Sequence, residues 1–130
     1  MVQWHWDLHK RKKTGGRRYI WRKKRKYERG GEPTETILGP ERIRVDMVKG
    51  GNIKVRLLRG EYVNLFIPGE NKTIKTKIVK VLDNPANRDY SRRGVITKGA
   101  RILTEYGEAI ITSRPGQNGV LNARLLKSEV

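Results

Sequence analysis

Cationic side chains gather at the start of the chain, where their density suits the binding of phosphate groups. Residues 1–31 carry twelve Lys and Arg against only Asp7 and Glu28, a net charge of +10. Cations at this density release condensed counterions when they bind nucleic acid, so such binding depends strongly on salt. The phosphate-binding candidates are Lys10, Arg11, Lys12, Lys13, Arg17, Arg18, Arg22, Lys23, Lys24, Arg25 and Lys26.

Aromatic rings are interleaved with these cations. All three Trp residues of the chain and two of its five Tyr residues lie in the same segment. Such rings stack on unpaired bases while neighbouring cations contact phosphate, so we expect Trp21 and Tyr27 to contribute to RNA binding. A solvated tail has no use for three Trp, and the run at 22–26 has no apolar face for a membrane surface.

The glycine pair Gly15–Gly16 interrupts the cationic run. Two glycines let a backbone approach a phosphate closely, and Arg17 and Arg18 follow directly. The pair does not belong to a Walker motif, because the Gly-Lys-Ser/Thr ending and a preceding strand are missing. Simple backbone flexibility explains the two glycines about equally well, so both interpretations stand.

Few side chains suit catalysis or metal binding. His5 and His9 are four residues apart and could share a metal on a helix, but apart from Asp7 no further ligands cluster there. Contact of His9 with phosphate or base is the favoured interpretation. The chain has no Cys, and its few remaining carboxylates lack the spacing of a two-metal nuclease. The sequence therefore predicts no enzyme activity, no metal and no cofactor.

From Glu32 onward the chain has the pattern of short strands. Polar and apolar residues alternate with period two in segments rich in Ile, Val and Thr. Turn residues, chiefly Gly, Pro and Asn, separate these segments. The predicted strands are 42–47, 52–57, 62–67, 72–81, 94–97, 101–104, 109–112 and 120–126.

These strands predict an all-β fold, a small closed or partly open β-barrel of about six to eight short strands. Its aliphatic face would lie inside and a cationic face outside. Residues 1–31 contain only three residues of the Val/Ile/Leu set, too few to offset the entropy of ordering. We therefore expect two parts: a basic, extended arm over 1–31, disordered when free, and a barrel domain over 32–130.

The barrel domain adds cationic and polar side chains in predicted turns. In the loop 113–119, Arg114 could reach phosphate, and Gln117 and Asn118 could bond base or ribose edges. A structural turn needing Pro and Gly is a slightly better account of that loop. A charge cluster is by default explained by exposure to water. That explanation is weaker here, because the arm already indicates that the chain binds a polyanion. Outside the arm, the RNA-binding candidates are Lys54, Arg92, Arg93, Lys98, Arg114 and Gln117.

Length and composition exclude several classes of protein. The chain has 130 residues, a net charge of +17 and a sequence pI near 10.6, which points to a polyanionic partner. No run approaches the roughly eighteen apolar residues of a membrane span. The N-terminus lacks the continuous apolar region of a signal peptide. We expect a location in the cytosol.

Taken together, the motifs resemble those of the archaeal and eukaryotic small-subunit ribosomal protein family S8e. They follow the order of that family along almost the whole chain, and the short length resembles the archaeal form. The matching segments are 13–17, 24–28, 33–36, 50–54, 83–87, 92–93, 96–100 and 112–117.

The resemblance implies a structural constituent of the small ribosomal subunit that binds ribosomal RNA and supports subunit assembly and translation in the cytoplasm. It implies a compact β-barrel with a basic N-terminal extension and no enzymatic activity. The implied partners are small-subunit ribosomal RNA and neighbouring small-subunit proteins, with no membrane and no small-molecule substrate. The alternative is a free nucleic-acid-binding protein of the chromatin or RNA-chaperone type.

Overall fold

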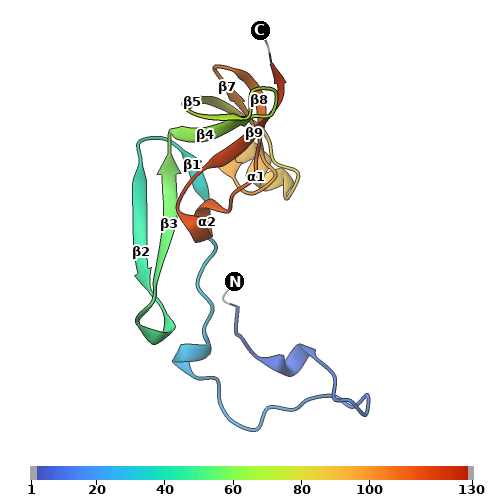
Figure 1. The fold of residues 1–130 in the computed structure, drawn as a ribbon. Helices are drawn as coiled ribbons and strands as arrows, with labels where there is room; N and C mark the ends of the chain where they lie inside the picture. The colour runs from blue at the N-terminus through green and yellow to red at the C-terminus, as the bar shows by residue number, and fades with distance from the viewer. Residues whose placement is uncertain (1–2, 129–130) are drawn as a thin grey trace. The chain divides into compact units, whose positions relative to one another are not determined.

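The computed structural model describes residues 3–128 of the chain (Figure 1). The chain divides into two compact units, Met1–Pro33 and Thr34–Val130. The first unit is the arm. Its described part holds two short 3-10 turns, η1 (Asp7–His9) and η2 (Lys26–Glu28), joined by extended chain. The second unit, which we call the barrel unit, holds all of the named strands. Each unit is described by itself.

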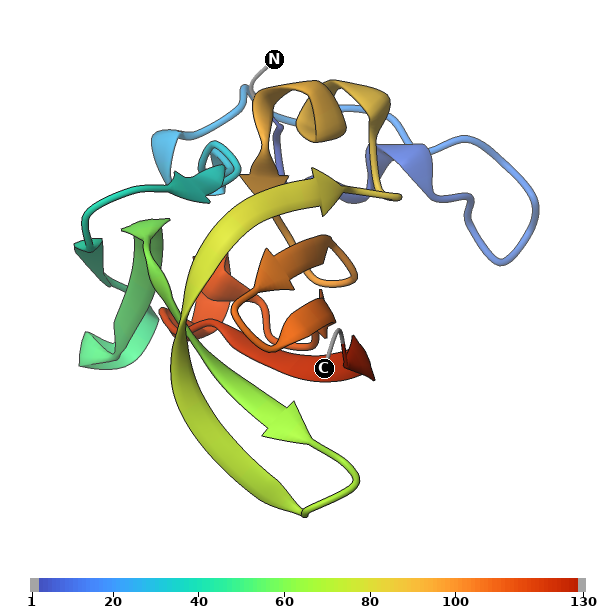
Figure 2. The same cartoon turned by 90° about the horizontal axis from the view of Figure 1, so that it is seen from above.

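Five strands of the barrel unit close into a barrel. Their order is β4-β5-β7-β8-β9, and all neighbours are antiparallel except the closing pair β4 and β9, which is parallel. Figure 2 shows β5 as a long, curved strand, and it pairs with both β4 and β7. The predicted all-β barrel is confirmed. The barrel strands are β4 (Tyr62–Ile67), β5 (Lys72–Asp83), β7 (Arg101–Thr104), β8 (Gly107–Ile111) and β9 (Asn122–Ser128).

A second sheet, which the sequence did not predict, has the order β2-β3-β1-β6. The antiparallel hairpin of β2 and β3 extends away from the barrel (Figure 1). Alternation places Ile43, Val45, Met47 and Ile53 together on one face of this hairpin, where all four are exposed. This differs from the expectation that every aliphatic face lies inside a barrel. The strands of this sheet are β1 (Thr36–Leu38), β2 (Arg42–Met47), β3 (Ile53–Gly60) and β6 (Val95–Ile96).

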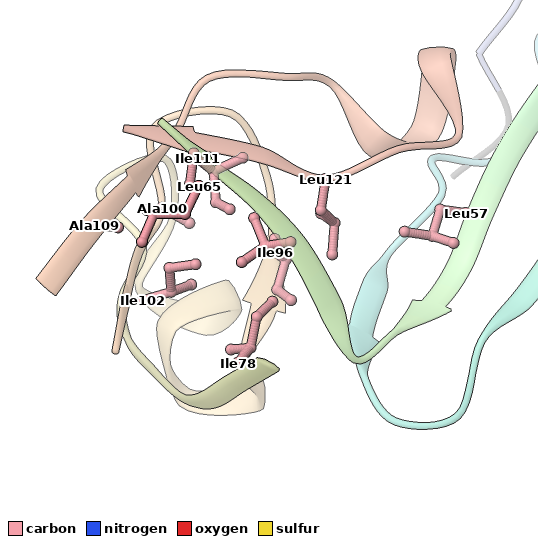
Figure 3. Close-up of a cluster of buried hydrophobic side chains, with 11 residues drawn as sticks. Leu57, Leu65, Ile78, Ile96, Ala100, Ile102, Ala109, Ile111 and Leu121 are labelled. Atoms are coloured by element: carbon pink, nitrogen blue, oxygen red, sulfur yellow. The ribbon is translucent and has the colours of Figure 1, made fainter. Parts of the chain in front are cut away.

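The hydrophobic core lies mainly between the barrel strands and extends to Leu57 of β3 and Ile96 of β6 in the second sheet (Figure 3). Alternation along β4 turns Val63 and Leu65 inward, where both are at most 1% exposed. They pack with Ile78, Ile102 and Ile111 from the other strands. Burying one such aliphatic side chain contributes about 1.5–3 kcal/mol. The period-two pattern of the sequence thus carries most of the stability of this unit.

Two short α-helices and one 3-10 turn connect the strands, the turn being η3 (Lys49–Gly51) between β2 and β3. The first, α1 (Arg88–Arg93), begins after Asn87, whose side chain accepts a hydrogen bond from the Asp89 N–H at 3.0 Å, and ends at Gly94 in the left-handed region. The second, α2 (Pro115–Asn118), ends at Gly119, which also has positive φ. The predicted loop 113–119 therefore contains a helical turn that is closed by a glycine.

Candidate nucleic-acid interface

The backbone of the arm closes on itself. Antiparallel bridges join Trp4 to Arg29 and Arg11 to Arg17. The His5 N–H donates to the Glu28 carbonyl at 2.9 Å, and the Gly30 N–H donates to the Gln3 carbonyl at 2.6 Å. The start and end of the described arm are therefore held together, and the cationic residues lie on the loop between them.

A single carboxylate, Glu28, organises this closed loop. It accepts hydrogen bonds from the Trp6 indole and the Arg22 guanidinium, and from the Arg25 backbone N–H at 3.0 Å. Only 12% of its side chain is exposed. The hydrogen bond from Arg22 is the main reason that the pKa of Glu28 falls to about 2. A carboxylate in the middle of a cationic segment is thus a structural residue of the arm.

The guanidinium of Arg22 lies close to two indole rings. Its central carbon is 5.2 Å from the centre of the Trp6 ring and 4.9 Å from that of Trp21. Cation–π contacts of this kind favour a planar arginine held against the ring face. Trp6 is half-buried in the arrangement, whereas Trp21 is 83% exposed. Trp6 therefore packs within the arm, whereas both predicted stacking rings, Trp21 and Tyr27, are open to a ligand.

The glycine pair lies in a tight turn. The Gly15 N–H donates to the Lys12 carbonyl, and the Lys12 N–H donates to the Gly16 carbonyl, both at 3.0 Å. Gly15 has a φ of +82°, a conformation that favours glycine. No other part of the arm lies within 4 Å of where its Cβ would be. The turn requires Gly15, and its backbone remains open to the approach of a phosphate.

Most predicted phosphate-binding side chains of the arm have no carboxylate partner. Asp7 pairs with Lys10 at 3.0 Å and with Arg18 at 3.5 Å, and Glu28 pairs with Arg22. Lys24 lies over the Trp4 ring, 5.4 Å from its centre. Within residues 3–128, the exposed arm cations without an ion pair are Arg11, Lys12, Lys13, Arg17, Lys23, Lys24, Arg25, Lys26 and Arg29.

In the barrel unit, the two neighbours Arg92 and Arg93 differ in their contacts. Arg93 forms a two-pronged ion pair with Glu35 and also bonds Asp89 at 3.0 Å, so it ties α1 to the chain before β1. The hydrogen bond from Arg93 is the main reason that the pKa of Glu35 is lowered. Arg92 and Lys98 are exposed and have no ion pair within the described residues. They are better placed than Arg93 to contact phosphate.

The turn before α1 is structural. Asn84 is 2% exposed, and its side-chain amide donates to the Val95 carbonyl at 2.8 Å and to the Thr97 hydroxyl at 2.9 Å. The Asp83 carboxylate accepts from the Asn84 N–H at 2.7 Å and from the Ser91 hydroxyl at 2.8 Å. These bonds fix the path from β5 through α1 to β6, and so position the arginines of α1.

The loop around α2 packs against the β2–β3 hairpin. A Cβ at Gly119 would lie 2.5 Å from Cγ1 of Val55, and one at Gly116 would lie 3.1 Å from the Thr34 Cβ. The Gly116 carbonyl also accepts a hydrogen bond from Arg56 at 3.1 Å. The structural explanation of these glycines therefore holds, while the side chain of Arg114 remains exposed.

The two remaining candidates are less open than Arg114. Gln117 on α2 is half-buried. Lys54 is also half-buried, on the polar face of the hairpin opposite Asp46. The same face carries Arg44 and Arg56, both paired with Asp46, at 2.7 and 2.8 Å. The structure thus spreads the candidates of the barrel unit over α1, α2 and the hairpin instead of bringing them into one site.

Sites for other functions are not evident in the part of the chain that the structure describes. Within residues 3–128, no three His, Asp or Glu side chains cluster closely enough to hold a metal ion. Nor does any helix there have the length and apolarity that crossing a bilayer requires. The dominant surface features are exposed cations and aromatic rings.

A small β-barrel joined to a cationic, aromatic arm defines a nucleic-acid-binding protein. The chain matches the family model for ribosomal protein S8e over residues 5–126, and it belongs to that family. The predicted family is therefore confirmed, and with it a structural role in place of an enzymatic one.

Curated archaeal relatives are named small ribosomal subunit protein eS8. The chain is 57% identical to the relative from Nanoarchaeum equitans over 106 residues, which span 82% of this chain and 84% of that protein. It is 51% identical to the relative from Sulfolobus acidocaldarius over 118 residues, spanning 90% and 92%. It is 52% identical to the one from Saccharolobus solfataricus over 120 residues, spanning 92% and 90%.

Proposed function

We propose that this chain is a structural constituent of the small ribosomal subunit, where its arm binds ribosomal RNA. In this role it lies in the cytoplasmic ribosome beside neighbouring small-subunit proteins and supports subunit assembly and translation. Membership of the S8e family and the names of the archaeal relatives support this assignment. The chain takes no small-molecule substrate or cofactor in this role.

The observation that carries the proposal is the organisation of the arm around Glu28. This carboxylate engages Arg22 and Trp6, and Asp7 pairs with Lys10 and Arg18, so the loop closes while most of its other cations keep no carboxylate partner. Those cations lie on the closed loop and neutralise phosphates that would otherwise repel one another in packed RNA.

Sedimentation of a cell lysate tests the assignment. We expect the protein to migrate with small subunits in a one-to-one ratio, and a high-salt wash should release it because its contacts are largely ionic. A predominantly free or DNA-associated pool would instead support the alternative, a free nucleic-acid-binding protein.

A crosslinking map on the intact subunit tests the residues. We expect RNA crosslinks at Lys12, Lys13 and the run 23–26, where cations lack carboxylate partners. Arg93 should give none, since two carboxylates surround it. RNA crosslinks at Arg93, with none in the arm, would contradict the proposal that the arm cations contact RNA.

A further inference from the structure

The outer face of the barrel carries aromatic, amide and cationic side chains that the sequence analysis did not select as a site. Alternation along β4 turns Tyr62, Asn64 and Phe66 outward while Val63 and Leu65 fill the core. Tyr62 is 50% exposed, and Phe66, the only Phe of the chain, is 38% exposed. The two rings therefore lie on the same outer face of β4, one on each side of Asn64 and about 13 Å apart along the strand.

The neighbouring strands bring polar partners to these rings. Asn64 lies between Lys75 of β5 and Asn122 of β9, and Phe66 lies between Thr73 and Arg124. Residues directly opposite each other on paired strands share one face of the sheet. We call this surface the β4 face, and it consists of Tyr62, Asn64, Phe66, Thr73, Lys75, Asn122 and Arg124.

The charges of the β4 face are available to a ligand. Lys75 and Arg124 are exposed, and neither has a carboxylate within ion-pair distance among residues 3–128. The ammonium of Lys75 lies 5.2 Å from the centre of the Tyr62 ring. By contrast, the nearby Lys77 is paired with Glu61 at 2.6 Å. The face therefore presents two free cations beside two aromatic rings.

The two asparagines retain unused hydrogen-bonding groups. The Asn64 amide donates to the Asn122 side-chain carbonyl at 3.0 Å. Each Asn side chain has one carbonyl and one NH₂ group, so Asn64 keeps an exposed acceptor and Asn122 an exposed donor. The edge of a nucleic-acid base carries both a hydrogen-bond donor and an acceptor, which match these two groups. Asn64, Phe66, Asn122, Ala123 and Arg124 are among the residues that line a groove of about 430 Å³ on this face. Tyr62 and Lys75 line a neighbouring pocket of about 130 Å³, to which Asn64 also contributes.

We propose that the β4 face is a second RNA-binding site, specific for unpaired bases of a single strand. Phe66 and Tyr62 stack on the bases, the asparagine pair bonds a base edge, and Lys75 and Arg124 contact the flanking phosphates. Aromatic rings beside cations on a barrel surface suit single strands, because every base has a face for stacking. The inference extends the proposed function, on which it rests, from the arm to a different part of the molecule.

A titration of the full chain with a uridine hexamer tests the site, because the chain offers separate reporters. All three Trp residues lie in residues 1–31, so quenching of Trp fluorescence reports binding by the arm. Amide NMR shifts at Asn64, Phe66 and Asn122 report the β4 face. We expect both signals to change with the hexamer, and the amides to change much less with duplex RNA of equal length.

Matched variants separate stacking from general attraction. Phe66→Leu keeps an apolar side chain but removes the ring, and should weaken binding at the β4 face about tenfold. Tyr106→Leu is the control, since Tyr106 is 37% exposed and lies between β7 and β8. Circular dichroism and the melting temperature establish that each variant is folded.

Any one of five results overturns the site. If Trp fluorescence is quenched but the amide shifts of the β4 face do not change, RNA binds to the arm alone. The proposed function then stands and the second site does not. If duplex RNA shifts the β4-face amides as much as the hexamer does, the face is a general phosphate-binding surface. If Phe66→Leu binds the hexamer as tightly as the unchanged chain, Phe66 has only a structural role. Shifts that follow protein concentration without RNA indicate a second copy as the occupant. If neither Trp nor amides respond, the site and RNA binding by the arm both fail.

Discussion

The arm and the barrel unit differ in what holds each of them together. The arm closes around Glu28, a carboxylate that binds an indole and a guanidinium. The barrel unit has a core of eleven buried hydrophobic residues, among them Leu65 and Ile102, neither of which is exposed. The chain therefore has one unit organised by polar contacts and one organised by burial.

This difference matters for how each unit meets RNA. A unit held together by ion pairs and hydrogen bonds can carry many cations on its surface. It needs few apolar residues, and some of its cations form the contacts that close it. A hydrophobic barrel instead fixes side chains rigidly on its outer strands, at spacings set by the sheet. We infer that the arm supplies electrostatic attraction and the barrel supplies positioned contacts.

Neutralising the arm should give the largest effect. Replacing Lys23, Lys24, Arg25 and Lys26 by Gln removes four cations that have no carboxylate partner in the described structure. At about 0.7 counterions per phosphate contact, RNA affinity near 0.1 M salt should fall by roughly a hundredfold or more, and the slope of log affinity against log salt should lose about 3 units.

The control for this variant makes the same charge change in the barrel unit, at Arg42, Lys49, Arg59 and Lys80, which are exposed and have no ion pair within the described residues. Its salt slope should change by less than about 1 unit if the arm supplies most of the ionic contact. An equal loss of slope in both variants would remove the distinction between the two units.

A crowded glycine should give the next largest effect, on stability. Gly119 and Gly51 both have positive φ, but only Gly119 faces a neighbour, because a Cβ added there would lie 2.5 Å from Val55. Gly119→Ala should lower the free energy of unfolding by about 2–4 kcal/mol and Gly51→Ala by about 1 kcal/mol. Urea unfolding followed by circular dichroism measures both, and equal losses would show that contact with Val55 is unimportant.

The two tryptophans that contact Arg22, Trp6 and Trp21, should behave differently. Trp21→Ala removes an exposed ring, so RNA binding should weaken by about 1–3 kcal/mol at every salt concentration, with an unchanged slope. Trp6→Ala removes a hydrogen bond to Glu28 and should loosen the arm, which amide exchange at Glu28 and Gly30 detects. If Trp6→Ala weakens RNA binding at every salt concentration more than Trp21→Ala does, the assignment of Trp21 as the stacking ring is wrong.

The smallest expected effect is on pH dependence. The hydrogen bond from Arg22 lowers the pKa of Glu28 from 4.5 to about 2. A lowered pKa in the ordered state means that protonation opposes order, so the closed arm is fully stabilised above about pH 4.5 and loses this stabilisation as the pH falls through about 2. Trp fluorescence should change in that window. Glu28→Gln should abolish the transition, and a transition that persists would assign it to another group.

Much of the fold could be predicted from alternation alone. Strands β2, β4 and β7 begin and end where the period-two pattern does. The three-residue β1 was missed, because Thr36–Leu38 is too short to show a period and is stabilised by parallel pairing with β3. Short strands of this kind depend on tertiary partners that no local pattern records.

The candidate site was predictable to the extent that it depends on charge. The cationic run and its aromatic rings are visible in composition, so the arm was identified by its residues. The role of Glu28 was not, because it needs Trp6 and Arg22 to meet it in space. An isolated acidic residue within a basic run was the available signal. The β4 face was missed for the same reason, since Asn64 and Asn122 are 58 residues apart.

The parallel pairing of β4 with β9 has a consequence for the order of events during synthesis. Asn64 of β4 can pair with Asn122 of β9 only after that residue has been synthesised, which happens 58 residues later. At about 5–20 residues per second, that interval is roughly 3–12 s. Throughout it, the inner face of β4 has no closing strand, whereas every residue of the arm has already been made. The growing chain thus completes its cationic segment first, and the barrel closes only after β9 emerges.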